Sequence, residues 1–156
     1  MPIFMKFDGI DGDVTEPGFE KSIEVMSFSW GCSTNVRNIG GGSSSGKVSF
    51  ADLAFHKVLD KTSPKLFLGC AQGKHIPMVT LTVLKPERDK LEKYLQYELV
   101  DVIISSYQIA GNSGDLPFDA VSISFAKIKF TYYVRNADGS VEPVEATWDQ
   151  KTNKGG

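Results

Sequence analysis

The apolar residues of the longest strand-like segment change parity half-way along it. Val121, Ile123 and Phe125 share one parity, whereas Ile128 and Phe130 lie on the other. The same change occurs between residues 95–99 and residues 100–104. Because a strand keeps one buried face with a period of two, the change indicates either a bend at a barrel corner or a strand covered on both faces, for instance by a neighbouring subunit. The pattern therefore predicts long antiparallel strands that close, or nearly close, around a core.

Shorter segments repeat the alternation of apolar and polar residues. It covers residues 3–7 and 79–83, and Asp138-Gly139 is typical of a hairpin turn that leads into a strand at residues 144–148. Residues 23–30 are also typical of a strand with a parity change. A bulge near Val25 would place five apolar residues on one face: Ile23, Val25, Met26, Phe28 and Trp30.

Residues 63–73 break the strand pattern and favour a short helix. Ser63 can cap it, Pro64 suits the first helical position, and Gly73 can end it. Three apolar residues fall on one face: Leu66, Phe67 and Cys70. We expect Leu66 and Phe67 to be buried against the sheet, so that Phe67→Ala would cost about 3–5 kcal/mol.

Length and composition agree with one globular domain. The chain has 156 residues, of which 41% are hydrophobic and 23% charged, enough for one sizeable core. We predict a mainly β fold: an antiparallel β-barrel-like pair of sheets with one short α-helix at about residues 63–73 and a long Gly/Ser loop. We expect a single domain over residues 1–149 and a flexible C-terminal tail over residues 150–156.

The Gly/Ser loop contains a near match to a phosphate-binding P-loop, Gly41-Gly42-Ser43-Ser44-Ser45-Gly46-Lys47-Val48. In a P-loop a Ser or Thr follows the lysine and binds Mg²⁺, and the motif opens a helix. Here Val48 offers no oxygen, and the residues after it alternate as in a strand. The segment is therefore expected to be a flexible loop between two strands rather than a nucleotide site.

Charge and hydropathy argue against several classes of function and location. Seventeen basic and nineteen acidic residues give a formal charge of −2 without a basic stripe, which argues against nucleic-acid binding. Residues 1–8 contain no apolar core of a Sec signal peptide, and no apolar stretch is long enough to span a bilayer, so we expect no membrane insertion. Two cysteines, Cys32 and Cys70, are too few for a disulfide framework and are expected to be two reduced, buried thiols. We expect the protein to be made and folded in the cytoplasm and, if it leaves the cell, to use a route other than Sec.

Candidate catalytic and metal-binding residues do not form a convincing site. Cys70 and His75 could be a nucleophile and a base, but Cys70 is expected on the apolar helix face, where a cysteine is usually part of the core. The two cysteines and two histidines lack the spacing of a zinc site: Cys32, His56, Cys70 and His75.

The acidic residues do not complete a site either. Three of them resemble the start of a calcium loop but have the wrong spacing: Asp8, Asp11 and Asp13. Asp115 and Asp119 are interpreted as solvated carboxylates in a loop. We therefore expect no catalytic residues, no cofactor and no metal, and we expect a protein that is not an enzyme.

Several runs of residues, in order along nearly the whole chain, resemble the Hcp (haemolysin-coregulated protein) family, the tube-forming component of bacterial type VI secretion systems. The most specific block runs from Asp60-Lys61-Thr62-Ser63-Pro64 to Gly73-Lys74-His75. The other runs are Ser29-Trp30-Gly31, the Gly40–Lys47 loop, Asp52-Leu53, residues 102–107, residues 125–128 and Trp148.

The resemblance implies a structural role. In this family six subunits form a ring with an open lumen, and rings stack into a tube inside a contractile sheath. Contraction expels the tube, tipped by a spike protein, and the lumen can hold effector proteins. The resemblance thus implies a homohexamer that is made in the bacterial cytoplasm and then secreted without a Sec signal.

The resemblance also assigns two sets of residues. The strand that would line the lumen contributes Ser27, Ser29 and Gly31. The loop that would contact the next ring contains Arg37, Asn38, Gly40, Gly41, Gly42, Ser43, Ser44, Ser45, Gly46 and Lys47. The alternative is a monomeric β-barrel binding module for a small apolar ligand, which would need an apolar cavity.

Overall fold

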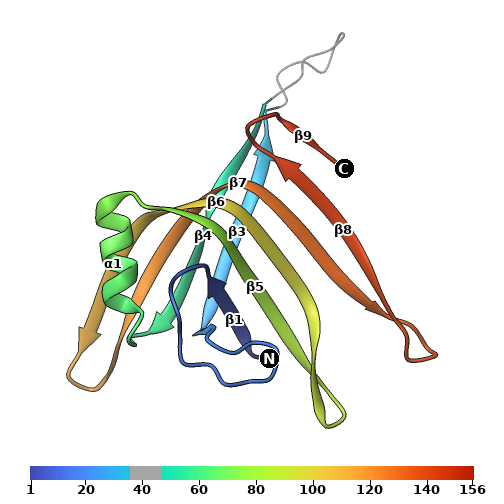
Figure 1. Cartoon of the computed structure of the whole chain (residues 1–156), viewed down its shortest axis with the longest axis horizontal. Helices are drawn as coiled ribbons and strands as arrows, with labels where there is room; N and C mark the ends of the chain where they lie inside the picture. Colours follow the sequence, from blue (N-terminus) through green and yellow to red (C-terminus); the bar gives the residue numbers. More distant parts are fainter. Residues whose placement is uncertain (36–46) are drawn as a thin grey trace.

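The computed structural model describes residues 1–35 and 47–156, and these ranges contain nine strands and one helix (Figure 1). The elements, in chain order, are β1 (Ile3–Phe7), β2 (Ile23–Val25), β3 (Ser27–Thr34), β4 (Val48–Val58), α1 (Ser63–Gln72), β5 (His75–Glu87), β6 (Lys90–Asn112), β7 (Asp115–Arg135), β8 (Val141–Asp149) and β9 (Lys154–Gly155).

All strand pairs of the sheet are antiparallel, in the order β2-β1-β5-β6-β7-β4-β3, with β8 added to β7 and β9 added to β8. The two ends of this path, β2 and β3, are separated in the chain only by Met26. The sheet therefore curls back on itself, which confirms the predicted mainly β, barrel-like class. We call β3, β4 and the adjoining parts of β6 and β7 the first layer, and the remaining strands the second layer.

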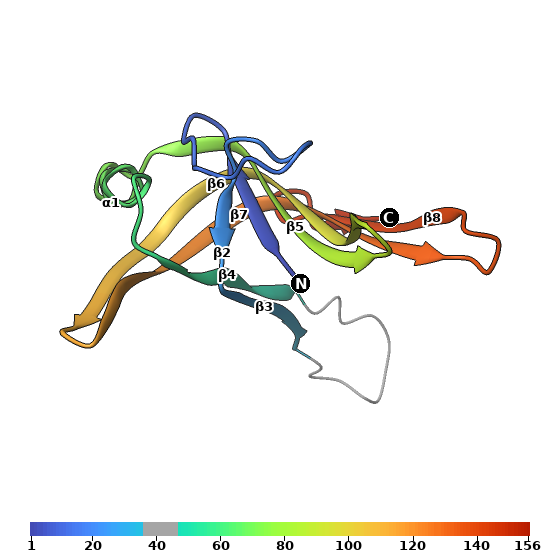
Figure 2. The same cartoon turned by 90° about the horizontal axis from the view of Figure 1, so that it is seen from below.

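The long strands β6 and β7 belong to both layers (Figures 1 and 2). Residues 90–103 of β6 pair with β5. Residues 118–123 of β7 pair with β4, whereas residues 127–135 pair with β8. One continuous hairpin thus joins the two layers and gives the pair of sheets its corner.

The predicted changes of parity occur at these corners. In β6, Tyr97 and Leu99 are buried before Asp101, and Val102 and Ile104 after it. Asp101 has φ 55, in the left-handed region that aspartate tolerates better than most residues. In β7 the buried parity shifts between Phe125 and Ile128. The bends account for the apolar residues of both parities that are buried within the single subunit.

Side chains fill the space between the layers. The rings of Phe7 and Phe55 pack with centroids 5.9 Å apart, and Tyr97 packs against Phe130 at 5.0 Å and against Trp30 at 5.3 Å. This filled interior gives no support to the alternative of a small apolar ligand held inside the barrel.

The single bulged strand predicted for residues 23–30 is wrong at Met26. Ile23 and Val25 are buried in β2, but Met26 is 62% exposed and lies between β2 and β3. Its backbone N–H donates to the carbonyl oxygen of His56. The chain therefore passes from one edge of the sheet to the other at Met26, and its side chain turns outward.

The helix begins and ends where the sequence predicts, but with a different exposed face. Gly73 caps the C-terminus with φ 60. At the N-terminus the cap position is Thr62, and Ser63 is already helical. Leu66 is fully buried, whereas Phe67 is 57% exposed, so the predicted burial of Phe67 is wrong for the single subunit. Adjacent helix positions differ by 100°, and the buried residues of the helix are Ser63, Leu66 and Gly69.

Beyond β8, residues 154–155 pair with β8 as β9, and Thr147 and Gly156 exchange backbone hydrogen bonds. The expected flexibility of the tail stays a prediction. Over the described ranges, no helix is sufficiently long and apolar to cross a membrane.

Candidate assembly surfaces

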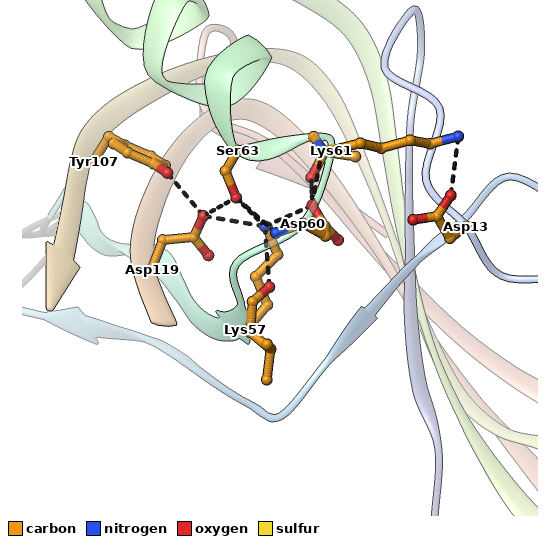
Figure 3. Close-up of polar contacts among 9 residues, drawn as sticks. Asp13, Lys57, Asp60, Lys61, Ser63, Tyr107 and Asp119 are labelled. Atoms are coloured by element: carbon orange, nitrogen blue, oxygen red, sulfur yellow. Dashed lines mark hydrogen bonds and ion pairs between the residues drawn. The ribbon is translucent and has the colours of Figure 1, made fainter. Parts of the chain in front are cut away.

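The ammonium group of Lys57 is fully buried beside the first turn of α1 (Figure 3). Its Nζ lies 3.0 Å from a carboxylate oxygen of Asp119 and 3.0 Å from one of Asp60. It also donates to the hydroxyl oxygen of Ser63 at 2.9 Å. A buried charge is tolerated only when it is paired and hydrogen-bonded, and both conditions are met here.

Asp119 connects this cluster to β6. Its Oδ2 accepts hydrogen bonds from Ser63 at 2.7 Å and from the Tyr107 hydroxyl at 2.8 Å, while its Oδ1 is buried without a hydrogen-bond partner among the described residues. We call Lys57, Asp60, Ser63, Tyr107 and Asp119 the anchor cluster. It joins β4, α1, β6 and β7, so it fixes the helix against the first layer.

The bonding pattern of the anchor cluster is structural. The Ser63 hydroxyl donates to Asp119, and its oxygen accepts from Lys57 and from the backbone N–H of Asp60. Lys57 donates a hydrogen bond to the Ser63 oxygen and accepts none from the hydroxyl, so it is not placed as a base for Ser63. Ser63 is therefore not arranged as an activated nucleophile.

The cluster also shifts two pKa values. Burial, together with the Asp119 carboxylate that accepts its hydrogen bond, raises the pKa of Tyr107 to about 12. Burial opposes ionisation of Asp60, but hydrogen bonds from Thr62 and Lys57 outweigh it and place the pKa of Asp60 below its ordinary value.

The interpretation of Asp115 and Asp119 as two solvated loop carboxylates is wrong for Asp119. Asp115 is exposed at the start of β7, but Asp119 is fully buried further along that strand. The signal that could have revealed the pair is parity. Lys57 shares the parity of Leu53 and Phe55, and Asp119 shares that of Val121 and Ile123. A lysine and an aspartate at core positions of two strands indicate a buried ion pair.

The other chemistry-bearing residues lie apart. Cys32 is exposed on β3, so the expectation of a buried thiol is wrong there, and Cys70 is half-buried on α1. His75 contacts Asp101 at 2.8 Å, and Lys151 contacts the same carboxylate at 2.9 Å. Two acidic residues of the N-terminal segment pair with lysines, Asp11 with Lys6 and Asp13 with Lys61. Within residues 1–35 and 47–156, no three His, Cys, Asp or Glu side chains come together as a metal site.

The strand expected to line the lumen has two different faces. Phe28 and Trp30 pack against the core, whereas Ser27 and Ser29 are exposed on the opposite face. The register with β4 shifts between Ser29 and Gly31, and Gly31 is half-exposed. Of the loop expected to contact the next ring, Arg37, Asn38 and Gly40–Gly46 lie outside the described residues, and Lys47 is exposed immediately before β4.

Two backbone edges of the first layer are open. β3 pairs with β4 along one edge, and in the described part of the chain no strand pairs with its other edge. Residues 105–112 of β6 pair with β7 only, because the pairing with β5 ends at Ile103. These edges lie on opposite sides of the layer (Figure 1).

Two exposed apolar surfaces are present among the described residues. The helix groove, about 590 Å³ in volume, lies between α1 and β6 and is lined by Leu59, Asp60, Ser63, Pro64, Phe67, Tyr107 and Ile109. The hairpin face lies on β7 and β8 and comprises Phe130, Tyr132 and Val144, with exposures of 36%, 40% and 58%. α1 and β8 stand on opposite sides of the molecule (Figure 1).

Comparison with known proteins identifies the family. Residues 4–132 match the family model described as type VI secretion system effector, Hcp. The chain belongs to the Hcp family. This confirms the resemblance seen in the sequence and makes the protein a type VI secretion system tube and effector protein, from a family of structural secreted proteins.

Individual Hcp proteins agree with this assignment. The chain is 34% identical over 110 residues to protein hcp1 of Pseudomonas aeruginosa, which covers 69% of this chain and 68% of the relative. The crystal structure of Hcp1 from Salmonella typhimurium is similar with a TM-score of 0.82 at 32% identity, covering 99% of this chain and 97% of that one. The structure of a type six secretion system protein gives a TM-score of 0.89 at 27% identity, with 99% of both chains covered.

Proposed function

We propose that this Hcp chain assembles into a six-subunit ring whose first layers join edge to edge around a lumen. The observation that carries the proposal is the pair of open edges, β3 on one side and residues 105–112 of β6 on the other. Two different edges on opposite sides favour a head-to-tail contact, and such contacts form a ring when the rotation between neighbouring subunits closes.

Edge pairing also removes a liability of the single subunit. An open strand edge presents unpaired N–H and C=O groups that invite uncontrolled association. Pairing β3 of one subunit with β6 of the next would satisfy both rows of backbone groups at once. The first layers would then form one continuous sheet around the ring.

In such a ring the exposed face of the first layer surrounds the lumen. Ser29 is the cross-strand partner of Ala54, and Ala54 is the partner of Ser122, so small side chains run across this face. Together with Ser27 and Gly31 they form a smooth wall that effector proteins could approach without a specific pocket. Six copies would supply avidity despite weak contacts with each subunit.

The remaining parts of the proposal follow the family. The loop that contains Arg37, Asn38, Gly40–Gly46 and Lys47 is proposed to dock onto the next ring, and stacked rings to form a tube inside a contractile sheath with a spike protein at its tip. The protein would be made in the bacterial cytoplasm and expelled without a Sec signal.

The test is the mass and shape of the purified protein. Light scattering should give the mass of six subunits at micromolar concentration, and negative-stain images should show rings with open centres. Hydrogen exchange then locates the contact: amides of β3 and of residues 105–112 should exchange more slowly in rings than in diluted subunits, whereas β5, paired on both edges, should serve as the unchanged control. A purely monomeric protein would contradict the proposal.

A further inference from the structure

The helix groove is a firm, partly apolar surface with nothing on it in the single subunit. Phe67 and Ile109 are each 57% exposed, and the Phe67 ring packs against Tyr107 with centroids 6.3 Å apart. The anchor cluster holds the groove from beneath, because the Tyr107 hydroxyl donates to Asp119 and Ser63 is bonded to Lys57. The groove is therefore preformed rather than a product of loose side chains.

The hairpin face is a second preformed apolar surface. Tyr132 and Val144 are direct cross-strand partners, and Phe130 lies two residues before Tyr132 on the same face. The Tyr132 ring packs against Tyr94 at 5.3 Å, and Phe130 packs against Tyr97 at 5.0 Å. The face thus continues outward from the core.

The other side of the same hairpin differs in character. Lys129 lies there between Glu98 and Glu145, at 3.6 and 3.5 Å. Val141 is also on that side, because it differs from Val144 by an odd number of residues in a strand without a register shift.

The two apolar surfaces lie on different sides of the molecule, as the two open edges do. The helix groove lies beside the β6 edge, because Ile109 belongs to both. β8 and the part of β7 paired with it lie on the side of the molecule away from α1 (Figures 1 and 2). A head-to-tail contact that joins the β3 and β6 edges would turn the side of one subunit that lies away from α1 towards the helix of the next.

We infer that the helix groove of each subunit receives the hairpin face of its neighbour, a second copy of this chain. The inference rests on the proposed ring and adds a second-layer contact to the edge pairing of the first layer. Charge agrees with it: Lys65 lies on the exposed side of α1, and Glu142 lies on the same face of β8 as Val144. Both apolar surfaces, which no other described segment covers, would then be buried by one repeated contact.

A matched pair of substitutions on one hairpin tests the contact. Val144→Asp places a charge in the proposed apolar interface, whereas Val141→Asp, at 45% exposure on the opposite face, is the control. Val144→Asp and Phe67→Asp should each raise the protein concentration at which half of the subunits are assembled by at least about tenfold. Val141→Asp should leave it unchanged, and far-UV circular dichroism of all three variants checks that the subunit is folded.

Cross-linking provides a measurement that does not depend on weakening the ring. In a Cys32→Ser/Cys70→Ala background, Phe67→Cys combined with Val144→Cys should give a ladder up to six subunits with a short bis-maleimide reagent. Each single cysteine, and Phe67→Cys combined with Val141→Cys, should give none. Intact rings without this ladder, or rings indifferent to Val144→Asp, would overturn the groove contact alone, whereas a monomeric unsubstituted protein would overturn the ring itself.

Discussion

At the scale of single residues, the buried ion pair of Lys57 and Asp119 is the feature on which stability depends most. Removing one partner leaves the other charge buried and uncompensated, which costs about 3–5 kcal/mol. We therefore expect Lys57→Met to lower the free energy of unfolding by that amount in urea denaturation at one fixed protein concentration.

Lys61→Met is the matched control for this substitution. Lys61 pairs with Asp13 at 3.0 Å, but both side chains are more than half exposed. Exposed pairs contribute at most about 1 kcal/mol, so this variant should be nearly as stable as the parent. Equal losses in the two lysine variants would contradict the assignment of the pair as the buried anchor.

The raised pKa of Tyr107 predicts a loss of stability in alkali. A pKa of about 12 in the folded protein against an ordinary value of about 10 means that folding favours the protonated phenol. The contribution is fully present below pH 10 and is lost as the pH rises towards 12. The melting temperature should therefore fall more steeply between pH 10 and 12 in the parent protein than in Tyr107→Phe, and parallel profiles would contradict the prediction.

Residue parity explains why the sequence predicted the core but not the cluster. Alternation identifies which side of a strand is buried, so Val121 and Ile123 were correctly assigned. Charged residues are normally placed at the surface, so Asp119 was assigned to solvent although it shares their parity. The burial of Asp119 becomes favourable only when it pairs with Lys57. The two residues lie on β7 and β4, strands that are far apart in the sequence and meet only in the folded sheet.

At the scale of elements, α1 is held by Leu66 and by the anchor cluster rather than by Phe67. Leu66 is fully buried, whereas Phe67 is 57% exposed. Leu66→Ala should cost about 2–5 kcal/mol in the dissociated subunit, whereas Phe67→Ala should cost less than about 1 kcal/mol there. Urea denaturation at a concentration below assembly distinguishes the two, and a large loss for Phe67→Ala would mean that the helix rotates relative to this structure.

Strands were predicted better than their ends. The parity changes in β6 and β7 predicted the barrel corners, because a bend changes which alternate residues are buried and this change is visible in the local sequence. The break between β2 and β3 at Met26 cannot be recognised in this way. In the sequence, an exposed methionine between two buried stretches has the same pattern as a residue in a bulge. Which edge β2 and β3 occupy depends on pairing with β1 and β4, distant in sequence.

At the scale of the whole molecule, the resemblance to the Hcp family predicts the ring, whereas the surfaces proposed to form it were found only in the structure. Nothing in the spacing of Phe130, Tyr132 and Val144 distinguishes a core from an interface, because both bury apolar side chains. Their partial exposure in the folded subunit separates the two cases. Partial exposure likewise marks Phe67 and Ile109, in the helix groove, as surface rather than core residues.

The Gly/Ser loop gives a prediction about stacking that is independent of the ring. Replacing Gly40–Gly46 with a short turn should leave six-subunit rings intact, because the edges and apolar surfaces proposed for the ring consist of other residues. Tube growth, measured as sedimentable polymer and seen by negative stain, should be impaired. If the variant fails to form rings, the loop belongs to the contact between subunits rather than between rings.

Ser29 tests the lumen itself. It is exposed on the face of β3 opposite to Trp30 and lies beside Ala54, so a larger side chain there meets no core residue and should not disturb folding. In a ring, Ser29→Gln would project six amide side chains into the lumen and reduce the smooth area open to effector proteins. We expect rings of normal mass that recover less of a cognate small effector in co-purification. Lys61→Gln, on the N-terminal side of α1 and ion-paired with Asp13, is the control and should recover the effector normally. Unchanged recovery by intact Ser29→Gln rings would remove Ser29 from the lumen wall and leave it an ordinary exposed strand residue.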